Sequence, residues 1–595
     1  MRAHNACQRK SGLSADYLKM EELPLNKVSL TIDGRTVTVP EGTTVLDAAE
    51  KINITIPRLC HHPDLQPVSA CRICVVEVKG DRLLRTACSW KVQEGMDVIT
   101  NSKVVRESRK MAMELLLSRH PMRCTECVRN GSCELRACAD QLGIREINFE
   151  YHQRQGGLDT SSPSIIRDPS KCILCRRCVQ TCTMVQSVSA IGMEGRGYEV
   201  WVDTPFGKGM NDVPCVACGQ CIDRCPVAAL YENSHMDRVW AALDNPDLHV
   251  VVQTAPAVRV AVGEEFGLAP GALVTDKLVA GLRRMGFDKV FDTDFTADLT
   301  IMEEGYELLG RLNNGGKLPM LTSCSPGWIN FIEHFYPELL PHVSSCKSPQ
   351  QMFGALAKTY YAEKMGIDAK KLYVVSVMPC TAKKWESGRP EMTSSGFQDV
   401  DAVLTTRELA TMMKQVGIDL PNLPDEAYDA PLGISTGAAV IFGATGGVME
   451  AALRTVYEVV TKKPLENVDI NAVRGLEGVK EAEVDLDGLK VRAAVANGLA
   501  NARKLMDKIV SGEANYHFIE IMACPGGCIG GGGQPIPTSM EIRKKRAEAI
   551  YKADRGLKIR KSHENPAVQQ LYREFLGEPN SHKSHELLHT HYSAK

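Results

Sequence analysis

Cysteines in short-spaced groups are the residues of this chain whose spacing could do chemistry. The sequence contains 22 cysteines among 595 residues, and its densest runs are CILCRRCVQTC, from Cys172, and CVACGQCIDRCP, from Cys215. Both have the C-x2-C-x2-C-x3-C spacing of chains that bind two [4Fe-4S] clusters, in which the fourth cysteine of each run ligates the other cluster. We therefore predict two such clusters, one on Cys172, Cys175, Cys178 and Cys225 and one on Cys215, Cys218, Cys221 and Cys182.

Two further groups of possible ligands precede these runs. The first has the spacing C-x10-C-x2-C-x13-C and comprises Cys60, Cys71, Cys74 and Cys88. Four thiolates suit a [2Fe-2S] cluster or zinc, but zinc modules usually pair two C-x2-C knuckles and only one is present, so we favour the cluster. The second has the spacing H-x3-C-x2-C-x5-C and comprises His120, Cys124, Cys127 and Cys133. It predicts a [4Fe-4S] cluster whose potential is raised by the neutral imidazole ligand.

Another cysteine pair lies in MACPGGCIGGGGQP, residues 522–535. Cys524 and Cys528 could bind one soft metal centre, and the four glycines that follow would let a bulky inorganic group come close to the backbone. Read alone, the stretch could equally be a helix start with buried cysteines and a flexible glycine loop.

Composition indicates a soluble chain of several domains. Forty-four per cent of the residues are apolar and the formal net charge is -2, which gives no reason to expect nucleic acid as a partner. No stretch of about 18 uncharged apolar residues predicts a membrane span. Residues 1–26 have no apolar core typical of a signal peptide, and we interpret them as a tail. Grouped thiols in a large chain favour a reducing, cytoplasmic location.

The elements that must position these residues follow from the hydrophobic pattern. VSLTIDGRTVTV, from Val28, predicts a hairpin, and TTVLDAAEKI, from Thr43, predicts a short helix. After Glu232, strand patterns within residues 248–262, 289–295, 317–328, 371–386 and 399–409 alternate with helices, which indicates an α/β domain with a mostly parallel sheet. Ligands in such folds bind beyond the carboxyl ends of the strands.

Three stretches resemble the signature motifs of the iron-only, or [FeFe], hydrogenases, in the order that the family has them. They are TSCSPGW (322–328), MPCTAKKWE (378–386) and EIMACPGGCIGGGG (520–533). The first two ligand groups resemble the head of the large subunit of respiratory complex I and of some hydrogenases. With the C-terminal RKSHENPAVQQLY and SHELLHTHY, the resemblance covers nearly everything from Val28 onward.

The resemblance implies a multidomain α+β and α/β chain. Its expected parts are a tail (1–26), a β-grasp [2Fe-2S] ferredoxin-like domain (27–104), a His/Cys cluster segment (105–160), a two-[4Fe-4S] ferredoxin domain (161–236) and a large α/β catalytic domain with a C-terminal segment like the family's small subunit (237–595). The catalytic domain would carry an H-cluster, a [4Fe-4S] cube joined through a cysteine sulfur to a two-iron unit with carbon monoxide, cyanide and a dithiolate.

By motif position, the resemblance places Cys380, Cys524 and Cys528 on the cube, with Cys528 as the bridge, and Lys383 beside a cyanide. A compact cation that donates hydrogen bonds suits that role. The residues expected to pack around the two-iron unit are Ala255, Pro256, Met378, Phe442 and Met522.

Cys324-Ser325 departs from the family, which usually has two adjacent cysteines there. By position, the first is the proton donor and the second is the fourth ligand of the cube, so serine occupies a ligand position. Either the Ser325 oxygen coordinates iron, or the loop shifts and Cys324 binds, because iron in such a cube prefers thiolate.

A proton route is implied through Cys324, Glu304, Ser344 and Glu307. Glu304 and Glu307 are three residues apart on a predicted helix, where charged residues more often form a solvated face. His585 and His589, spaced i, i+4 in a histidine-rich tail, are expected to be solvated.

The sequence therefore predicts a hydrogenase that interconverts dihydrogen with two protons and two electrons. The rival interpretations are a complex I-like electron-transfer subunit and a hydrogen-sensing or iron-sulfur assembly relative that does not turn over. No G-x-G-x-x-G fingerprint follows a strand, so a nicotinamide or flavin would belong to partner subunits. We expect a hetero-oligomer with flavin- and NAD(P)-binding subunits, for which electron bifurcation is one mode of action, or soluble ferredoxin as the electron partner.

Overall fold

The computed structural model describes residues 26–152, 156–486 and 489–595, so the predicted tail lies, except for its last residue, outside the described part of the chain. Contacts divide the chain into two units. The first contains the described part of Met1–His61 together with Pro67–Ser118 and Leu135–Glu150, and the second contains His62–Gln66, Arg119–Glu134 and Tyr151–Lys595. None of the described helices is both long and apolar enough to cross a membrane.

The first unit is built on a five-stranded sheet with the order β2-β1-β5-β3-β4. The predicted hairpin is present: β1 pairs antiparallel with β2 across a turn in which Asp33 and Gly34 have positive φ values of 47° and 78°. The predicted short helix, α1, follows the hairpin and begins after Thr44, whose hydroxyl accepts from the Asp47 N–H. The elements are β1 (Lys27–Ile32), β2 (Arg35–Pro40), α1 (Val45–Lys51), β3 (Val75–Val78), β4 (Arg85–Thr86), β5 (Asp97–Ile99), α2 (Lys103–Leu117) and α3 (Glu134–Gln141).

The second unit begins with a small region of short strands and helices that carries the two dense cysteine runs. Antiparallel pairs β6-β9 and β7-β8 frame this region. Its elements are β6 (Ile165–Arg167), α4 (Arg177–Gln180), β7 (Gly192–Glu194), β8 (Trp201–Asp203), α5 (Gln220–Asp223) and β9 (Leu230–Glu232).

The rest of the second unit contains two four-stranded sheets where the sequence suggested one layer. The sheet β11-β10-β13-β14 is parallel throughout, whereas β12-β17-β16-β15 ends in an antiparallel pair. The strands are β10 (His249–Thr254), β11 (Lys289–Asp292), β12 (Met320–Leu321), β13 (Leu372–Met378), β14 (Ala402–Thr405), β15 (Val479–Leu486), β16 (Leu489–Asn497) and β17 (Phe518–Met522). The strand and loop expected within residues 248–262 are present: β10 stops at Thr254, and residues 256–261 form turns.

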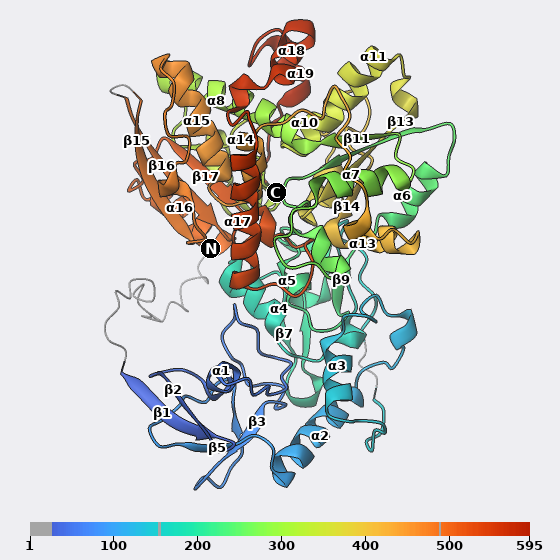
Figure 1. The fold of residues 1–595 in the computed structure, drawn as a ribbon, viewed down its shortest axis with the longest axis vertical. Helices are drawn as coiled ribbons and strands as arrows, with labels where there is room; N and C mark the ends of the chain where they lie inside the picture. The colour runs from blue at the N-terminus through green and yellow to red at the C-terminus, as the bar shows by residue number, and fades with distance from the viewer. Residues whose placement is uncertain (1–25, 153–155, 487–488) are drawn as a thin grey trace, which may run out of the picture. The chain divides into compact units, whose positions relative to one another are not determined.

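Helices pack around both sheets. In Figure 1, strands β15–β17 and strands β11, β13 and β14 are drawn on opposite sides of α17. The helices are α6 (Met236–Leu243), α7 (Thr275–Arg284), α8 (Thr293–Asn314), α9 (Pro326–Phe335), α10 (Pro349–Leu356), α11 (Ala362–Met365), α12 (Ala382–Ser387), α13 (Thr406–Gln415), α14 (Gly437–Val440), α15 (Gly447–Thr461), α16 (Leu499–Val510), α17 (Met540–Gly556), α18 (Pro566–Leu571) and α19 (His582–Leu588).

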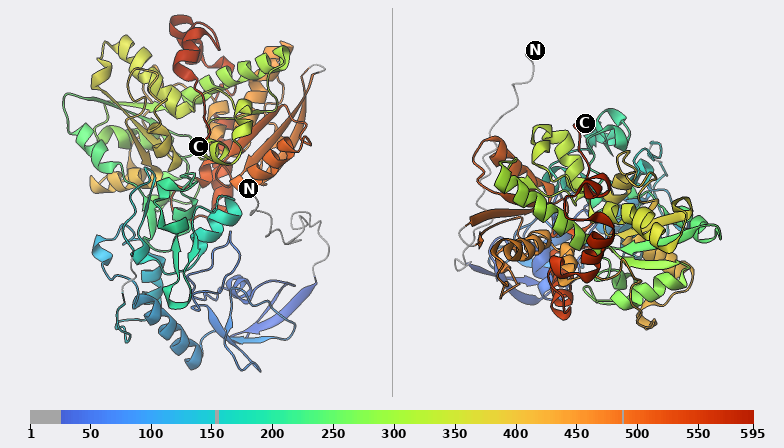
Figure 2. Two further views of the ribbon diagram at one scale, coloured as in Figure 1. Left: turned by 180° about the vertical axis from the view of Figure 1, so that it is seen from behind. Right: turned by 90° about the horizontal axis from the view of Figure 1, so that it is seen from above.

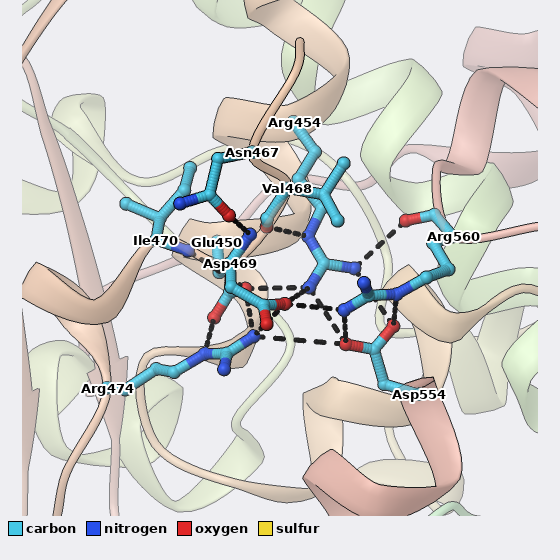
Figure 3. A network of polar contacts seen from close by, with 9 residues as sticks. All are labelled: Glu450, Arg454, Asn467, Val468, Asp469, Ile470, Arg474, Asp554 and Arg560. Carbon is cyan, nitrogen blue, oxygen red and sulfur yellow. Dashed lines mark hydrogen bonds and ion pairs between the residues drawn. The ribbon is translucent and has the colours of Figure 1, made fainter. Parts of the chain in front are cut away.

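The C-terminal segment, residues 540–595, is integrated into the second unit. Figure 2 shows its dark red end beside the green helix α8, and α18 and α19 contact α8 and α10 respectively. At the start of this segment, a buried ionic network connects α17 to α15 (Figure 3). Arg454 donates to Glu450 at 2.7 Å and to Asp554 at 2.9 Å. Arg474 and Arg560 complete the network, so three guanidinium groups face Glu450, Asp469 and Asp554.

Candidate active site

The ends of four parallel strands bring the three motif segments to one cavity. Ala255 follows β10, Cys380 follows β13, Ser323 and Cys324 follow β12, and Met522 ends β17. The motifs are far apart in the sequence. Parallel pairing brings the carboxyl ends of β10 and β13 together in one sheet and those of β12 and β17 together in the other, and both sets of ends line the cavity.

The cavity is lined by the residues that the sequence singled out. Cys324, Ser325, Cys380, Lys383, Cys524 and Cys528 face it together with all five residues expected to pack there, namely Ala255, Pro256, Met378, Phe442 and Met522. Thr293, Pro349 and Gln350 also line it and were missed by the sequence analysis, because none of them lies in a cysteine motif.

The glycine run reaches the cavity at Gly531, as expected, and also packs tightly on neighbouring backbone. A Cβ atom added at Gly531 would lie 2.1 Å from the Pro379 carbonyl oxygen, and one at Gly532 would lie 2.3 Å from that of Cys218. These glycines therefore let the run pack directly on the backbones of two other cysteine segments. Arg407 fastens the same run by donating to the Gly532 and Gln534 carbonyls at 2.8 and 2.6 Å.

The thiols of the cavity suit a soft metal centre. Burial raises the pKa of Cys380 and Cys524 and raises that of Cys528 to about 12. Neighbouring thiols contribute in the same direction, since Cys380 raises the pKa of both other cysteines. Thiolates gathered in such a place need a cationic metal to balance them, so these residues fit an iron-sulfur cube.

Lys383 lies at the edge of the cavity with its ammonium group oriented by protein acceptors. Its Nζ donates to Glu386 Oε2 at 2.9 Å and to the Cys324 carbonyl at 3.3 Å. Gln350 Nε2 donates to the same Glu386 oxygen at 3.0 Å. Glu386 is a positioning residue that the sequence analysis missed, although its i, i+3 spacing from Lys383 on α12 is a signal for it.

Cys324 and Ser325 differ in their surroundings. Burial, followed by the charges of Glu304 and Cys528, raises the pKa of the Cys324 thiol well above its usual range. Ser325 Oγ instead accepts a hydrogen bond of 3.2 Å from the Ala523 N–H, next to Cys524. The cysteine is thus the residue that interacts with the acidic helix α8.

On α8, Glu304 and Glu307 are not the solvated face that charge spacing alone would favour. Glu304 is 2 % exposed, and burial, with the nearby charge of Glu307, raises its pKa to about 8. Both Glu304 oxygens lack a close hydrogen-bond partner among the described residues, although Ser344 and the Ser323 backbone lie near enough to lower its pKa. Glu307 is partly buried and accepts from Ser344 Oγ at 2.8 Å.

The thiols of the two dense cysteine runs gather as their pairing predicts. Cys215, Cys218, Cys221 and Cys182 line one smaller cavity. Burial, and then the charges of Cys175, Cys172 and Cys225, raises the pKa of Cys178. The four thiols of the other predicted cluster therefore lie close together. Cys218 also lines the large cavity, so one proposed accessory site lies directly beside it.

The His120 group also lies in the second unit. His120 is buried, and its Nδ1 is 3.1 Å from the Lys171 carbonyl oxygen. A proton on Nδ1 leaves the Nε2 lone pair for a metal, which is the usual arrangement of a histidine ligand. The three cysteines that follow His120 in the sequence are partly buried, namely Cys124, Cys127 and Cys133.

The first unit holds the four cysteines of the predicted [2Fe-2S] site in its own interior. Cys60, Cys71, Cys74 and Cys88 are all buried. The Cys71 and Cys88 thiols are within hydrogen-bond reach of Cys60, and Cys74 is within reach of Cys88. The four sulfurs therefore converge as a [2Fe-2S] site requires.

Comparisons with protein families divide the chain along the same lines. The description "Iron only hydrogenase large subunit, C-terminal domain" matches residues 248–532, and "Iron hydrogenase small subunit" matches 540–595. Three iron-sulfur descriptions match the preceding residues: a 2Fe-2S cluster binding domain (26–103), an NADH-ubiquinone oxidoreductase-G iron-sulfur binding region (109–148) and the ferredoxin-like domain of NADH-quinone oxidoreductase subunit 3 (162–231).

Individual proteins are similar over most of the chain. The NADP-reducing hydrogenase subunit HndD of Solidesulfovibrio fructosivorans is 52% identical over 96% of this chain and 99% of its own. Iron hydrogenase 1 of Clostridium pasteurianum is 44% identical over 95% of this chain and 99% of its own. A solved structure of apo [FeFe]-hydrogenase HydA1 from Chlamydomonas reinhardtii, 49% identical, covers 61% of this chain and 99% of its own with a TM-score of 0.55.

Proposed function

The chain belongs to the iron-only, or [FeFe], hydrogenase family, and from this premise we propose how its residues divide the interconversion of dihydrogen with two protons and two electrons. The observation that carries the proposal is the single cavity into which three separate motifs bring their thiols and one lysine, and which five apolar residues also line. The complex I-like electron carrier has no need of such a cavity.

In this proposal Cys380, Cys524 and Cys528 would hold the cube of the H-cluster, with Cys528 as the thiol shared with the two-iron unit. The bound H-cluster would supply the site at which dihydrogen is cleaved or formed. Lys383, held by Glu386, would offer its ammonium hydrogens to a cyanide ligand of that unit. Ala255, Pro256, Met378, Phe442 and Met522 exclude water from that unit, as their apolar side chains in the cavity lining support.

We propose that Ser325 supplies the fourth ligand of the cube and that Cys324 is the proton donor. The placement of Ser325 Oγ against the residue before Cys524 supports the ligand role. The effect of burial, and then of the Glu304 charge, on the pKa of the Cys324 thiol supports the donor role. With this division, the serine substitution alters the ligand set of the cube and leaves the proton route intact.

The proton route proposed from the cavity runs from the Cys324 thiol to Glu304, then through Ser344 to Glu307. Glu304 has a pKa of about 8, so it exchanges a proton near neutral pH, which suits a group that must both accept and donate. Ser344 connects the acids because its hydroxyl donates to Glu307 at 2.8 Å and it lies beside Glu304.

Electrons are proposed to travel between the cavity and a partner through the accessory clusters. The two [4Fe-4S] clusters of the dense cysteine runs, the His120 cluster and the [2Fe-2S] cluster would form the route, with Cys218 at its inner end. NAD(P)-linked, flavin-carrying subunits are the proposed partners, supported by similarity to an NADP-reducing hydrogenase subunit and to NADH oxidoreductase domains. Soluble ferredoxin is the alternative partner.

Two coarser expectations follow for the cell. We propose that the chain works in the cytoplasm, because its grouped cysteines need a reducing compartment to remain free thiols or cluster ligands. We also propose a hetero-oligomer. Purification from the native host tests it, and a chain that elutes alone at its own mass would count against fixed partner subunits.

An infrared spectrum of anaerobically matured protein tests the central proposal. We expect bands from iron-bound carbon monoxide and cyanide that shift when dihydrogen replaces argon. Correctly matured protein with full iron content and no such bands would leave only an electron carrier.

A further inference from the structure

The C-terminal segment places a buried histidine against the proposed proton route. His589 is 8 % exposed, where the sequence pattern favoured a solvated residue. An antiparallel β-bridge between the backbones of Cys346 and His589 holds the histidine in this position. In it, the Thr590 N–H donates to the Ser345 carbonyl and the Lys347 N–H donates to the Leu588 carbonyl, both at 2.8 Å.

Hydrogen bonds connect this histidine to Glu307. His589 Nδ1 lies 2.8 Å from Ser345 Oγ, and Ser345 Oγ lies 3.3 Å from Glu307 Oε2. On the other side of the ring, Nε2 lies 3.1 Å from Glu303 Oε2, and Glu303 also accepts from the Tyr572 hydroxyl. The exposed ring of His585 contacts the ring of His589, with a centroid separation of 4.2 Å and an angle of 40° between the ring planes.

The other side of Glu307 is closed to proton transfer. Its Oε1 accepts from Arg311 at 2.6 Å, and the same guanidinium also donates to the Val343 and His342 carbonyls. An arginine stays protonated at all ordinary pH values and cannot relay a proton. A histidine side chain, in general, can gain and lose a proton near neutral pH. The side of Glu307 that faces Ser345 and His589 therefore leads to a group that can relay a proton.

We propose that Ser345 and His589 form a branch of the proton route that joins Glu307 to the surface at His585. Outward, protonated Glu307 gives its proton to Ser345 Oγ while Ser345 passes its own hydrogen to His589 Nδ1. The resulting imidazolium is stabilised by the Glu303 carboxylate and releases its proton to water beside His585. Only a proton moves, and the inward direction reverses these transfers.

The charged and titratable groups that face His589 come from three elements. Glu303 and Glu307 belong to α8, Cys346 precedes α10, and His585 and Tyr572 belong to the C-terminal segment. The His589 ring thus lies between carboxylates of α8 on one side and the exposed imidazole of His585 on the other.

The inference rests on the proposed proton route through Glu307, and two variants test it in matured holoenzyme. His589→Gln keeps a polar side chain but cannot carry a proton, and Ser345→Ala removes the link while leaving the His589–Glu303 pair in place. We expect each to lower dihydrogen turnover in both directions by about tenfold, to move the pH profile, and to be non-additive when combined. His582→Gln, an exposed residue of the same helix, is the matched control and should leave turnover unchanged.

Chemical rescue separates a relay from a merely structural role. In His589→Ala, added imidazole should restore most of the lost turnover without changing KM for dihydrogen or the carbonyl and cyanide infrared bands. Folded Ser345→Ala and His589→Gln variants with wild-type turnover would overturn the branch, and so would a loss that imidazole does not rescue. If Glu304→Gln also retains turnover, the proposed route itself fails; if Glu304→Gln is inactive, only the branch does.

Discussion

The hydroxyl of Ser325 accepts a hydrogen bond of 3.2 Å from the backbone N–H of Ala523, the residue before Cys524. This contact sets a serine, in a position where the family usually has cysteine, beside a proposed ligand of the cube. Cys324, its neighbour, is instead influenced first by burial and then by Glu304. The two residues therefore have separable roles, which substitutions can distinguish.

Ser325→Ala should convert the cube into a three-iron cluster. An alanine offers no ligand, so the iron at that corner is lost when Ser325 is its fourth ligand. Electron paramagnetic resonance of protein that carries the cube without the two-iron unit should show a new three-iron signal, at about one spin per chain. The matched variant Cys324→Ala should keep four irons. The opposite pattern, with Cys324→Ala losing the corner iron, would assign the ligand to Cys324.

Glu304→Gln should abolish most turnover and yet stabilise the fold at alkaline pH. Burial raises the pKa of Glu304 from 4.5 to about 8, so the folded protein keeps a proton that the unfolded chain loses across this interval. The contribution of Glu304 to the free energy of unfolding of the wild type therefore falls as pH rises from about 4.5 to about 8. Glutamine does not ionise, so the variant does not suffer this fall. Turnover should drop by at least about 100-fold, because glutamine cannot exchange a proton.

Thermal unfolding at matched scan rates measures the stability effect of Glu304→Gln. The two proteins should unfold at similar temperatures near pH 4.5, and the variant should gain an advantage that is complete by about pH 8. Iron content and infrared bands serve as controls for the cofactor. An advantage that shrinks as pH rises would show that Glu304 is ionised in the folded protein.

His120→Cys should lower the reduction potential of one accessory cluster. A thiolate adds negative charge where a neutral imidazole stood, which disfavours the added electron by on the order of 100 mV. Redox titration followed by electron paramagnetic resonance measures the shift, and the other clusters in the same sample are internal controls. An unchanged set of potentials would mean that His120 is not a ligand.

Arg454→Met should weaken the attachment of the C-terminal segment. Arg454 is fully buried and donates to Glu450 and Asp554, so its removal leaves acidic groups of the network in Figure 3 under-compensated. Loss of one partner from a buried ion pair costs about 3–5 kcal/mol. The urea midpoint should fall, and proteolysis should release the segment earlier. Lys490→Met, which breaks an exposed pair with Glu483, should change neither measurement.

Several features of this chain could be predicted from residue order because their chemistry is local. Three or four cysteines within a dozen residues can meet around one metal whatever the rest of the fold does, and the Asp33-Gly34 turn requires only the backbone freedom of two positions. The three motifs around Cys324, Cys380 and Cys528 were recognisable because each is a short contiguous pattern.

Other features depend on contacts between residues hundreds of positions apart. Sequence spacing favoured a solvated face for Glu304, whereas the packing of α8 among α10, α14 and α15 leaves it buried. Gly531 of the glycine run lines the cavity, as the sequence suggested, but the packing of the run on the backbones of Pro379 and Cys218 is visible only in the tertiary structure. The division of the strands between two sheets was not readable, because periodicity does not specify which strands pair.

The sequence by itself indicated which groups of thiols could share a metal, since ligand type and short spacing are properties of the chain. The proton route was implied by resemblance, and only the tertiary structure showed which of its groups lie at hydrogen-bond distance and that Ser345 and His589 adjoin it. A route for protons needs groups at hydrogen-bond distance, and the pairs Ser344 with Glu307 and Ser345 with His589 join positions 37 and 244 residues apart. Such distances are set by how strands and helices pack, and no local pattern contains them.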